Sequence, residues 1–331
     1  MLTINGSYGE GGGQLVRTAV GLSAVTGKPV TITNIRAARK KPGLAAQHIA
    51  AISAVAGTCS AGITGAKIGS RSLTFSPGEP EYQDLTVNVG TAGSIPLVIQ
   101  AWLPLALCYG GRLRISGGTE VNRSPTIDYL DHVLAGILRA AGAQIIIEIV
   151  KRGYYPEGGG EVIIEVVKKN IPPIFPINAN HLPVGIISCS SNLPDHVANR
   201  QASAAALAIT SETGFPCTIE YDRRTGKSTG SSCTVYRGAK GGCANGRPGL
   251  PAEVVGENAA HSALAGFLNP ADVDMHLSDQ LLVPLALFGG EFTAPVLTSH
   301  ADTVCWLLRQ FGYTIAPRKG ATVEFSYDAG A

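Results

Sequence analysis

The segment Gly9–Arg17 joins a glycine-rich loop to one carboxylate, one amide and one guanidinium, in the order Gly-Glu-Gly-Gly-Gly-Gln-Leu-Val-Arg. Glycine adopts backbone conformations that other residues avoid, and it lets a charged ligand approach the main chain closely. The apolar periodicity that starts at Leu15 predicts a helix, whose N-terminus adds free N–H groups and positive dipole character. The segment therefore predicts an anion site that Arg17 completes; a tight strand-to-helix turn is the alternative.

A basic loop leads into a second predicted helix, which carries Gln47 and His48. Four positive charges within six positions, ending at a helix start, suit a phosphorylated ligand. A solvated charge cluster is the alternative. Because Arg36 ends the strand that follows the first helix, we expect the loop and the glycine segment to face one pocket. The cations of the loop are Arg36, Arg39, Lys40 and Lys41.

His300 lies in the sequence Thr-Ser-His-Ala-Asp, directly before the last long predicted helix. An imidazole at a helix start is well placed to attack or hold a phosphate, because the helix end stabilises the anion that it touches. From spacing alone, a structural hydrogen bond is the alternative role for this side chain.

The segment His276–Gln280 opens another apolar helix with the sequence His-Leu-Ser-Asp-Gln. Polar groups at this position suit contacts with a base or a ribose. An ordinary N-cap formed by Ser278 or Asp279 is the alternative, and it does not exclude such contacts by the same groups.

The elements around these segments recur three times along the chain. Each copy is predicted to run turn, helix, strand, loop, helix and two strands. A βαβαββ-like unit cannot bury its apolar face alone, so three units are expected to pack around a pseudo-threefold core in an α+β fold. This packing brings together the segments Gly9–Arg17, Gly90–Gln100 and His276–Gln280. The first helices of the copies are predicted at Leu15–Thr26, Ile95–Cys108 and Leu281–Phe288.

The pattern breaks between the second and third copies, where Asn170–Pro183 is rich in proline and asparagine and indicates a linker. A different series of strands and helices follows, which predicts a small α/β domain inserted in the third repeat. We expect a core of three repeats at residues 1–178 and 271–331, with the inserted domain at residues 179–270.

The composition limits the remaining function classes. With 45% hydrophobic and 15% charged residues, the chain can bury a sizeable core, and its net charge of +2 confines any nucleic-acid surface to a local patch. The sequence shows no apolar span and no signal-peptide pattern, so we expect a cytoplasmic protein without membrane segments. Seven cysteines without C-x-x-C spacing suit reduced, buried thiols. A metal site or disulfide among Cys217, Cys233 and Cys243 is the alternative.

A set of motifs spread over almost the full chain occurs in a fixed order. They are Gly6–Arg17, Ile35–Arg39, Lys41–Leu44, Gln47 with His48, Gly90–Ser94, Ser116–Thr119, Tyr155–Gly160, His276–Leu281, and Ser299 with His300. Together they resemble the RNA 3′-terminal phosphate cyclase family. The inserted domain is the least distinctive part, and its portion Gly226–Gly249 has no clear counterpart in the family pattern.

The resemblance implies a ligase that forms a cyclic phosphate ester in three ATP-dependent steps. A histidine attacks the α-phosphate of ATP, releases diphosphate and becomes a covalent histidine–AMP. The AMP then passes to the RNA 3′-phosphate, making an RNA-adenylate. The neighbouring 2′-OH attacks, expels AMP and closes a 2′,3′-cyclic phosphate. Closure gains from proximity, because the 2′-OH already lies beside its target.

The same motifs imply a role for each candidate residue, with His300 as the nucleophile and an acceptor fixing its tautomer. Glu10 is the expected ligand of Mg²⁺ or Mn²⁺, which prefer oxygen ligands. The residues matched to the nucleotide are Gln100, Pro125, His276, Leu277, Ser278, Asp279 and Gln280. Those matched to the transferring phosphates and the RNA end are Glu10, Gln14, Arg17, Arg36, Arg39, Lys40 and Gln47.

RNA 3′-phosphate ends are the expected partner, and self-association of the chain is left open. Two other interpretations compete with the cyclase. A non-catalytic, RNA-binding cyclase-like factor of ribosome biogenesis lacks the nucleophile, so the presence of His300 speaks against it. A carboxyvinyl transferase of related repeat architecture lacks a covalent nucleotide step, so labelling with ATP separates it from the cyclase.

Overall fold

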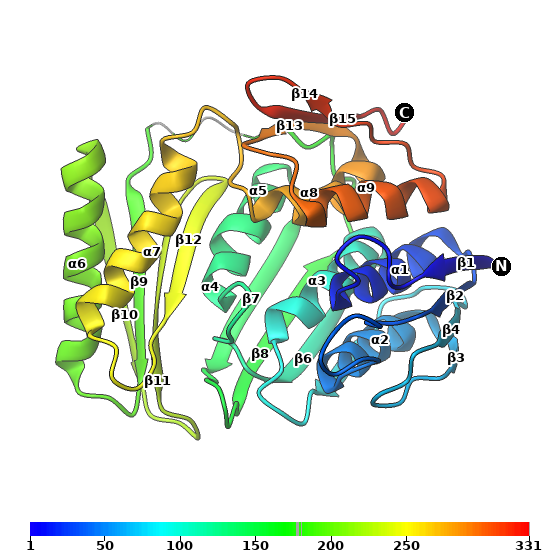
Figure 1. Cartoon of the computed structure of the whole chain (residues 1–331), viewed down its shortest axis with the longest axis horizontal. Coiled ribbons are helices and arrows are strands. Elements are labelled where there is room, and N and C mark those ends of the chain that lie inside the picture. Colours follow the sequence, from blue (N-terminus) through cyan, green and yellow to red (C-terminus); the bar gives the residue numbers. More distant parts are fainter. Residues whose placement is uncertain (177–178, 180, 331) are drawn as a thin grey trace.

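The computed structural model describes residues 1–176, 179 and 181–330, which form four separate β-sheets, and many of the strands alternate between more and less buried residues (Figure 1). In the strand Gly111–Gly117, for example, every second residue is buried, as expected for a strand with one face on the core. The fold is thus of the mixed α+β kind that the sequence predicts.

The first sheet has the strand order β1-β2-β4-β3, and only its β1–β2 pair is parallel. Helix α1 joins the parallel strands, and α2 follows β2. The elements are β1 (Leu2–Asn5), α1 (Gly13–Thr26), β2 (Val30–Thr33), α2 (Ala46–Cys59), β3 (Gly62–Thr64) and β4 (Leu73–Ser76).

The second sheet has the equivalent order β5-β6-β8-β7, again with a parallel first pair. The helical segment that follows β6 is interrupted by a π-helical turn, η1, between α4 and α5. The elements are β5 (Asp84–Asn88), α3 (Ile95–Tyr109), β6 (Gly111–Gly117), α4 (Ile127–Tyr129), η1 (Leu130–Leu134), α5 (Ala135–Ala140), β7 (Gln144–Lys151) and β8 (Gly160–Val167).

The third sheet has the order β13-β15-β14, and a parallel bridge joins Ile174 to Gly290 at the free side of β13. Ile174 therefore takes the place that β1 and β5 take in the other two sheets. The elements are α8 (Leu277–Phe288), β13 (Gly290–Ala294), α9 (Ser299–Phe311), β14 (Arg318–Lys319) and β15 (Val323–Tyr327).

The fourth sheet, of order β10-β9-β11-β12, lies between Ile174 and α8 in the sequence, and α6 and α7 pack on it with an apolar cluster of its own (Figure 1). The expected domain boundary at residue 178 lies outside the described residues. The elements are β9 (Val184–Ser191), α6 (Asp195–Thr213), β10 (Cys217–Arg224), β11 (Gly230–Arg237), β12 (Lys240–Asn245) and α7 (Ala252–Phe267).

In the part of the molecule that contains the first three sheets, the helices and not the sheets meet in the middle. Helix α3 contacts α1, α2 and α8, while α9 contacts α1 and α8. The fully buried Trp102 of α3 anchors this centre, and its indole N–H donates to Thr58 Oγ1 of α2 at 2.9 Å. A helix buried on nearly all sides must be mostly apolar, which explains the composition of α3. The packing of these helices therefore fixes the positions of the helix ends that carry the candidate residues.

Helix α8 begins at Leu277, four residues before the predicted start, because an earlier residue caps it. Asp274 Oδ1 accepts from the backbone N–H groups of His276 and Leu277, at 2.7 and 2.9 Å. The alternative of a cap by Ser278 or Asp279 is therefore wrong. Asp279 lies instead within the first turn of the helix.

The seven cysteines are free thiols, so the suggested disulfide among Cys217, Cys233 and Cys243 is not formed. Cys233 and Cys243 lie on neighbouring strands, and burial raises the pKa of their thiols to about 12 and about 11. Among the described residues, no helix has the length and apolar character needed to cross a membrane.

Candidate active site

The glycine loop before α1 lies along one face of α9. The hydroxyl of Ser299 donates to Glu10 Oε1, and a side chain at Gly9 would overlap Thr303. Gly9 also has a φ of +59°, a backbone conformation that favours glycine. The loop therefore holds Glu10 beside the first turn of α9, where the predicted nucleophile lies.

His300 is the second residue of α9, and its side chain is 48% exposed. Its Nδ1 lies 2.7 Å from Gln14 Oε1, and its Nε2 lies 3.4 Å from Glu10 Oε2. Thr298 caps the helix by accepting from the backbone N–H of Ala301 at 3.0 Å. The imidazole is thus held on one nitrogen and turned toward a carboxylate with the other.

Gln14 connects His300 to Asp279, which is 265 positions away from Gln14 in the sequence. The amide nitrogen of Gln14 donates to Asp279 Oδ2, because an ionised carboxylate only accepts hydrogen bonds. The amide oxygen therefore faces His300 and accepts from Nδ1–H. This assignment leaves Nε2 of His300 with its lone pair free, as a nucleophile requires.

The half-buried Asp279 and the buried Arg17 are oppositely charged groups beside this chain of hydrogen bonds. Burial raises the pKa of Asp279 to about 7, although the charge of Arg17 counteracts the shift. Burial lowers the pKa of Arg17 to about 10, despite the charge of Asp279. No hydrogen bond to the Arg17 guanidinium occurs within the described part of the chain, so its donors are available to an anion.

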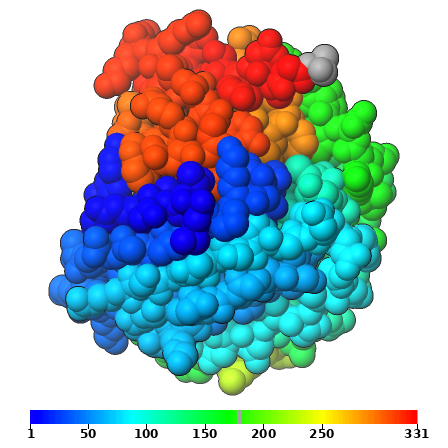
Figure 2. All heavy atoms as spheres, turned by 90° about the vertical axis from the view of Figure 1, so that its right-hand side faces the viewer, coloured from blue at the N-terminus to red at the C-terminus, as the bar shows by residue number. Residues whose placement is uncertain are grey.

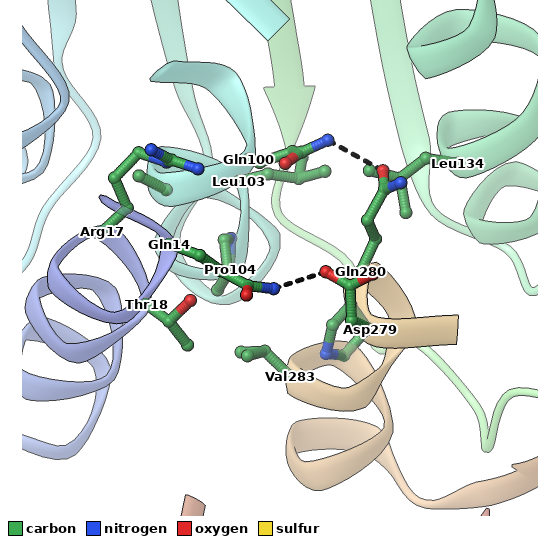
Figure 3. Close-up of a pocket in the computed structure, with 12 residues that line it drawn as sticks. Gln14, Arg17, Thr18, Gln100, Leu103, Pro104, Leu134, Asp279, Gln280 and Val283 are labelled. Atoms are coloured by element: carbon green, nitrogen blue, oxygen red, sulfur yellow. Dashed lines mark hydrogen bonds between the residues drawn. The ribbon is translucent and has the colours of Figure 1, made fainter. Parts of the chain in front are cut away.

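A pocket opens between α1, α3 and α8, and Figure 3 shows the side chains that line it. Gln14 points toward Asp279, and Gln100 of α3 donates to Gln280 Oε1 of α8 at 2.8 Å. Amides paired in this way, with apolar neighbours, present donors and acceptors to a planar polar ring. The lining residues are Gln14, Arg17, Thr18, Gln100, Ala101, Leu103, Pro104, Leu134, Asp279, Gln280, Val283 and Pro284.

The basic loop reaches the same site through Arg39, whose Nη2 lies 3.3 Å from the backbone oxygen of Glu10 and 3.6 Å from its Oε2. Arg36 turns back to its own loop and donates to the Gly43 carbonyl at 2.7 Å. Burial and the charge of Arg39 lower the pKa of Arg36. Lys40 is exposed.

Gln47 reaches the glycine segment of the second sheet, since its Oε1 accepts from the Ser94 N–H at 3.3 Å. Pro125 is half-buried near this segment, because the hydroxyl of the preceding Ser124 bonds to Ser94. Neither Gln47 nor Pro125 lines the pocket. Both lie beside the start of α3, on which Gln100 is placed.

The segment His276–Gln280 divides into two sets of side chains. Asp279 and Gln280 line the pocket, whereas Leu277 and Ser278 are fully buried away from it, with the Ser278 hydroxyl donating to the Met275 carbonyl. His276 is exposed, and its backbone oxygen accepts from Gln280 Nε2 at 2.6 Å. A helical turn explains the division, because consecutive residues point about 100° apart.

Comparison with known proteins agrees with this geometry. The family model described as RNA 3′-terminal phosphate cyclase matches residues 8–315. The chain belongs to this family. It is 45% identical over 314 residues to the RNA 3′-terminal phosphate cyclase of Methanococcoides burtonii, covering 94% of each chain. The proteins of the same name from Thermococcus onnurineus and Archaeoglobus fulgidus are each 42% identical, with 94% of this chain and 93% and 95% of theirs covered.

His48 lies against the start of α1, and sequence reasoning assigned it no role. It is buried, and its Nδ1 accepts from the Ala45 N–H at 2.9 Å. Burial, then the charges of Arg17 and Arg36, lower its pKa to about 3, so the ring is neutral. Its other nitrogen faces Gly13, where a side chain would overlap the ring. The signals in the sequence were its position next to Gln47 and its place in the set of family motifs.

Glu10 is the side chain that fits a divalent cation here. No group of three or more His, Cys, Asp or Glu side chains suited to a metal occurs in residues 1–176, 179 and 181–330. Mg²⁺ does not need such a cage, since it keeps several waters and binds through one or two carboxylates plus substrate phosphates. A single exposed carboxylate beside His300 fits that mode of binding.

Proposed function

We propose that the chain converts an RNA 3′-terminal phosphate to a 2′,3′-cyclic phosphate with ATP, through a covalent His300–AMP. The observation that carries this proposal is the hydrogen bond from His300 Nδ1 to Gln14 Oε1. It prepares the nucleophilic tautomer at a helix start, beside a buried guanidinium. Membership of the cyclase family supplies the reaction to which this arrangement is suited.

In the first step, Nε2 of His300 attacks the α-phosphorus of ATP. The N–P bond forms, the bond between the α-phosphorus and the bridging oxygen breaks, and diphosphate leaves with the electron pair. Positive charge develops on the imidazole, and Gln14 Oε1 stabilises it at Nδ1–H. Arg17 and Arg39 neutralise negative charge that gathers on the phosphates.

In the second step, an oxygen of the RNA 3′-phosphate attacks the same phosphorus, and the N–P bond breaks. His300 regains its lone pair, and the RNA carries an adenylate. In the third step, the 2′-oxygen attacks the 3′-phosphorus and loses its proton, while AMP leaves. The proton released by the 2′-OH passes to water.

The pocket between α1, α3 and α8 supports a place for the nucleoside part of ATP. Gln100 and Gln280 present amide groups to the edge of adenine, with Leu134 and Val283 along its faces. Asp279 and Arg17 line this pocket, and Gln14 connects Asp279 to His300, so the ribose and the α-phosphate would lie along this connection, from the base to the reacting nitrogen.

Mg²⁺ or Mn²⁺ held by Glu10 and the phosphates would supply charge neutralisation to the diphosphate leaving group. The residues of the chain carry the other tasks. Arg39 contacts Glu10 and so keeps that carboxylate turned toward His300.

We also infer that the first three sheets are copies of one unit, arranged around a pseudo-threefold core of residues 1–178 and 271–331. Their equivalent strand orders support this view. Helices α3 and α8 each carry glutamine and proline four residues apart, at Gln100 and Pro104 and at Gln280 and Pro284. The fourth sheet would then be a domain inserted in the third copy, at residues 179–270.

The activity is tested with two short RNAs, one ending in a 3′-phosphate and one in a 3′-OH. With ATP and Mg²⁺, the first is expected to gain an end that resists phosphatase until acid opens the cyclic phosphate, and the second stays unchanged. The matched control is His300→Ala, for which no such end is expected. Cyclisation without ATP, or by His300→Ala, would overturn the proposal.

A further inference from the structure

An aromatic pair lies open to solvent beside the candidate nucleophile. Tyr8 and Trp306 stack with their ring centroids 3.8 Å apart and their planes at 12°. Tyr8 is nevertheless 37% exposed. One face of the Tyr8 ring lies on Trp306, so a further ring can stack only on the opposite face. Figure 2 shows the dark blue N-terminal segment at the surface, next to the orange atoms of the C-terminal part that includes α9.

The register between the loop and α9 places this pair relative to His300. Glu10 contacts Ser299, Gly9 packs on Thr303, and Tyr8 stacks on Trp306. Ser299, Thr303 and Trp306 are four and three residues apart, so they lie on one face of α9. Followed from Glu10 back to Tyr8, the loop therefore runs along this face, away from the start of the helix. Trp306 is six residues after His300, which corresponds to about 9 Å along the helix axis.

Charge on the same side of the molecule suits a nucleic-acid strand. Arg39 lies against the Glu10 backbone, and Lys40 and Lys41 follow it as exposed cations. Single-stranded RNA is held by cations along its phosphates and by aromatic rings on which unpaired bases stack. The loop thus combines both kinds of group next to the reacting nitrogen.

We propose that Tyr8, supported by Trp306, is the surface on which the base of the 3′-terminal RNA nucleotide stacks. This inference rests on the proposed function, which brings the 3′-phosphate to His300. The terminal nucleotide would then reach from its 3′-phosphate at His300 to its base on Tyr8. Stacking tolerates every base, so the site selects an unpaired end and not a sequence.

The test is a comparison of binding, without ATP, so that its outcome is separate from that of the cyclisation assay. One RNA ends in a 2′-deoxynucleotide 3′-phosphate, which cannot cyclise, and the other lacks only the terminal base. For the unaltered protein, loss of the base is expected to weaken binding about tenfold. Tyr8→Ala is expected to bind the two RNAs equally, and Tyr8→Phe to restore the tenfold difference.

A matched control is Tyr82→Ala, which removes a 55% exposed tyrosine just before β5, at the opposite end of that strand from the Gly90 loop. It is expected to keep the tenfold difference. A difference that persists in Tyr8→Ala, or equal binding by the unaltered protein, would overturn the proposal.

Tryptophan fluorescence of the unaltered protein tests the stacking of the terminal base on Tyr8, even if Tyr8→Ala fails to fold. The chain has two tryptophans, and Trp102 is fully buried in α3, so Trp306 reports on this surface. In the unaltered protein, RNA with its terminal base is expected to quench Trp306 emission more than RNA without it. Equal quenching by the two RNAs would contradict stacking on Tyr8.

Discussion

At the scale of single residues, the orientation of one amide decides which nitrogen of His300 is free. Gln14 donates to Asp279 and accepts from His300, so it transmits the ionisation state of the carboxylate to the imidazole. The residue types in the glycine segment predicted an anion site, and the pairing of Gln14 was not predictable. Its two partners lie 265 and 286 positions away, and spacing alone does not say which donor an amide takes.

Gln14→Leu is expected to slow self-adenylylation by roughly 10²–10⁴-fold, because His300 loses the acceptor that fixes its tautomer. A time course of AMP incorporation measures the rate. Gln310→Leu, on the same helix as His300 but hydrogen-bonded to the Trp306 carbonyl, is the control and is expected to react at the normal rate. Equal rates for both variants would rule out the role assigned to Gln14.

The protonation of Asp279 leads to a prediction about the pH dependence of self-adenylylation. Its pKa is about 7, and below that pH the protonated carboxyl donates to Gln14, which reverses the amide and removes the acceptor from Nδ1. Self-adenylylation is therefore expected to fall as the pH drops through about 7. In Asp279→Asn, this fall in the rate of self-adenylylation near pH 7 is expected to be absent. A pH profile equal to that of the unaltered protein would contradict the mechanism.

The same raised pKa makes Asp279 a destabilising residue at high pH. Its folded pKa lies above the ordinary value of 3.8, so its contribution to stability is present at low pH and is lost as the pH rises through about 7. In Asp279→Asn this loss is expected to be absent, so the change in the free energy of unfolding between pH 5 and pH 8 is expected to differ from that of the unaltered protein by a few kcal/mol, because a tenfold change in proton affinity corresponds to roughly 1.4 kcal/mol. Denaturant unfolding of both proteins at pH 5 and pH 8 measures it; the same pH dependence in both would count against this account.

At the scale of elements, the start of α1 depends on a glycine that faces a buried ring. Gly13→Ala places a methyl group against His48, which cannot move because its Nδ1 is hydrogen-bonded to Ala45. The variant is expected to lose about 1–3 kcal/mol of stability. Gly136→Ala, in α5 with open space around it, is the control and is expected to gain up to about 1 kcal/mol. Thermal unfolding of both variants checks the contrast; no loss in Gly13→Ala would show that the helix start tolerates a side chain.

Helix positions were predictable from apolar periodicity to within a few residues, as α1 and α3 illustrate. The start of α8 was predicted four residues late, because Asp274 caps it from an irregular segment that has no periodic signal. The π-helical turn at Leu130–Leu134 was not predictable either.

At the scale of the whole molecule, a buried ion cluster connects the second and fourth sheets. Arg152, after β7, bonds to Glu120 and Asp128 near the second sheet and to Asp222 on β10, at 2.7–2.8 Å. Burial raises the pKa of Glu120, which favours its neutral form. Nothing in the sequence pattern pairs these residues, since each is separated from Arg152 by at least 24 positions.

Arg152→Met is expected to lower the free energy of unfolding by about 3–5 kcal/mol, because it leaves the Asp128 charge buried without a partner. Arg200→Met, which breaks an exposed pair with Glu253, is the control and is expected to lose less than about 1 kcal/mol. Denaturant unfolding compares the two variants. Similar losses would mean that the cluster does not hold the sheets together.

The covalent step at His300 is tested most directly by incubating the protein with α-labelled ATP and Mg²⁺, without RNA. The label is expected to remain on the protein after denaturation, to be released by acid, and to map to the peptide that contains His300. His300→Ala is expected to carry none. Label that persists undiminished in His300→Ala, or that maps to another residue, would contradict the central claim.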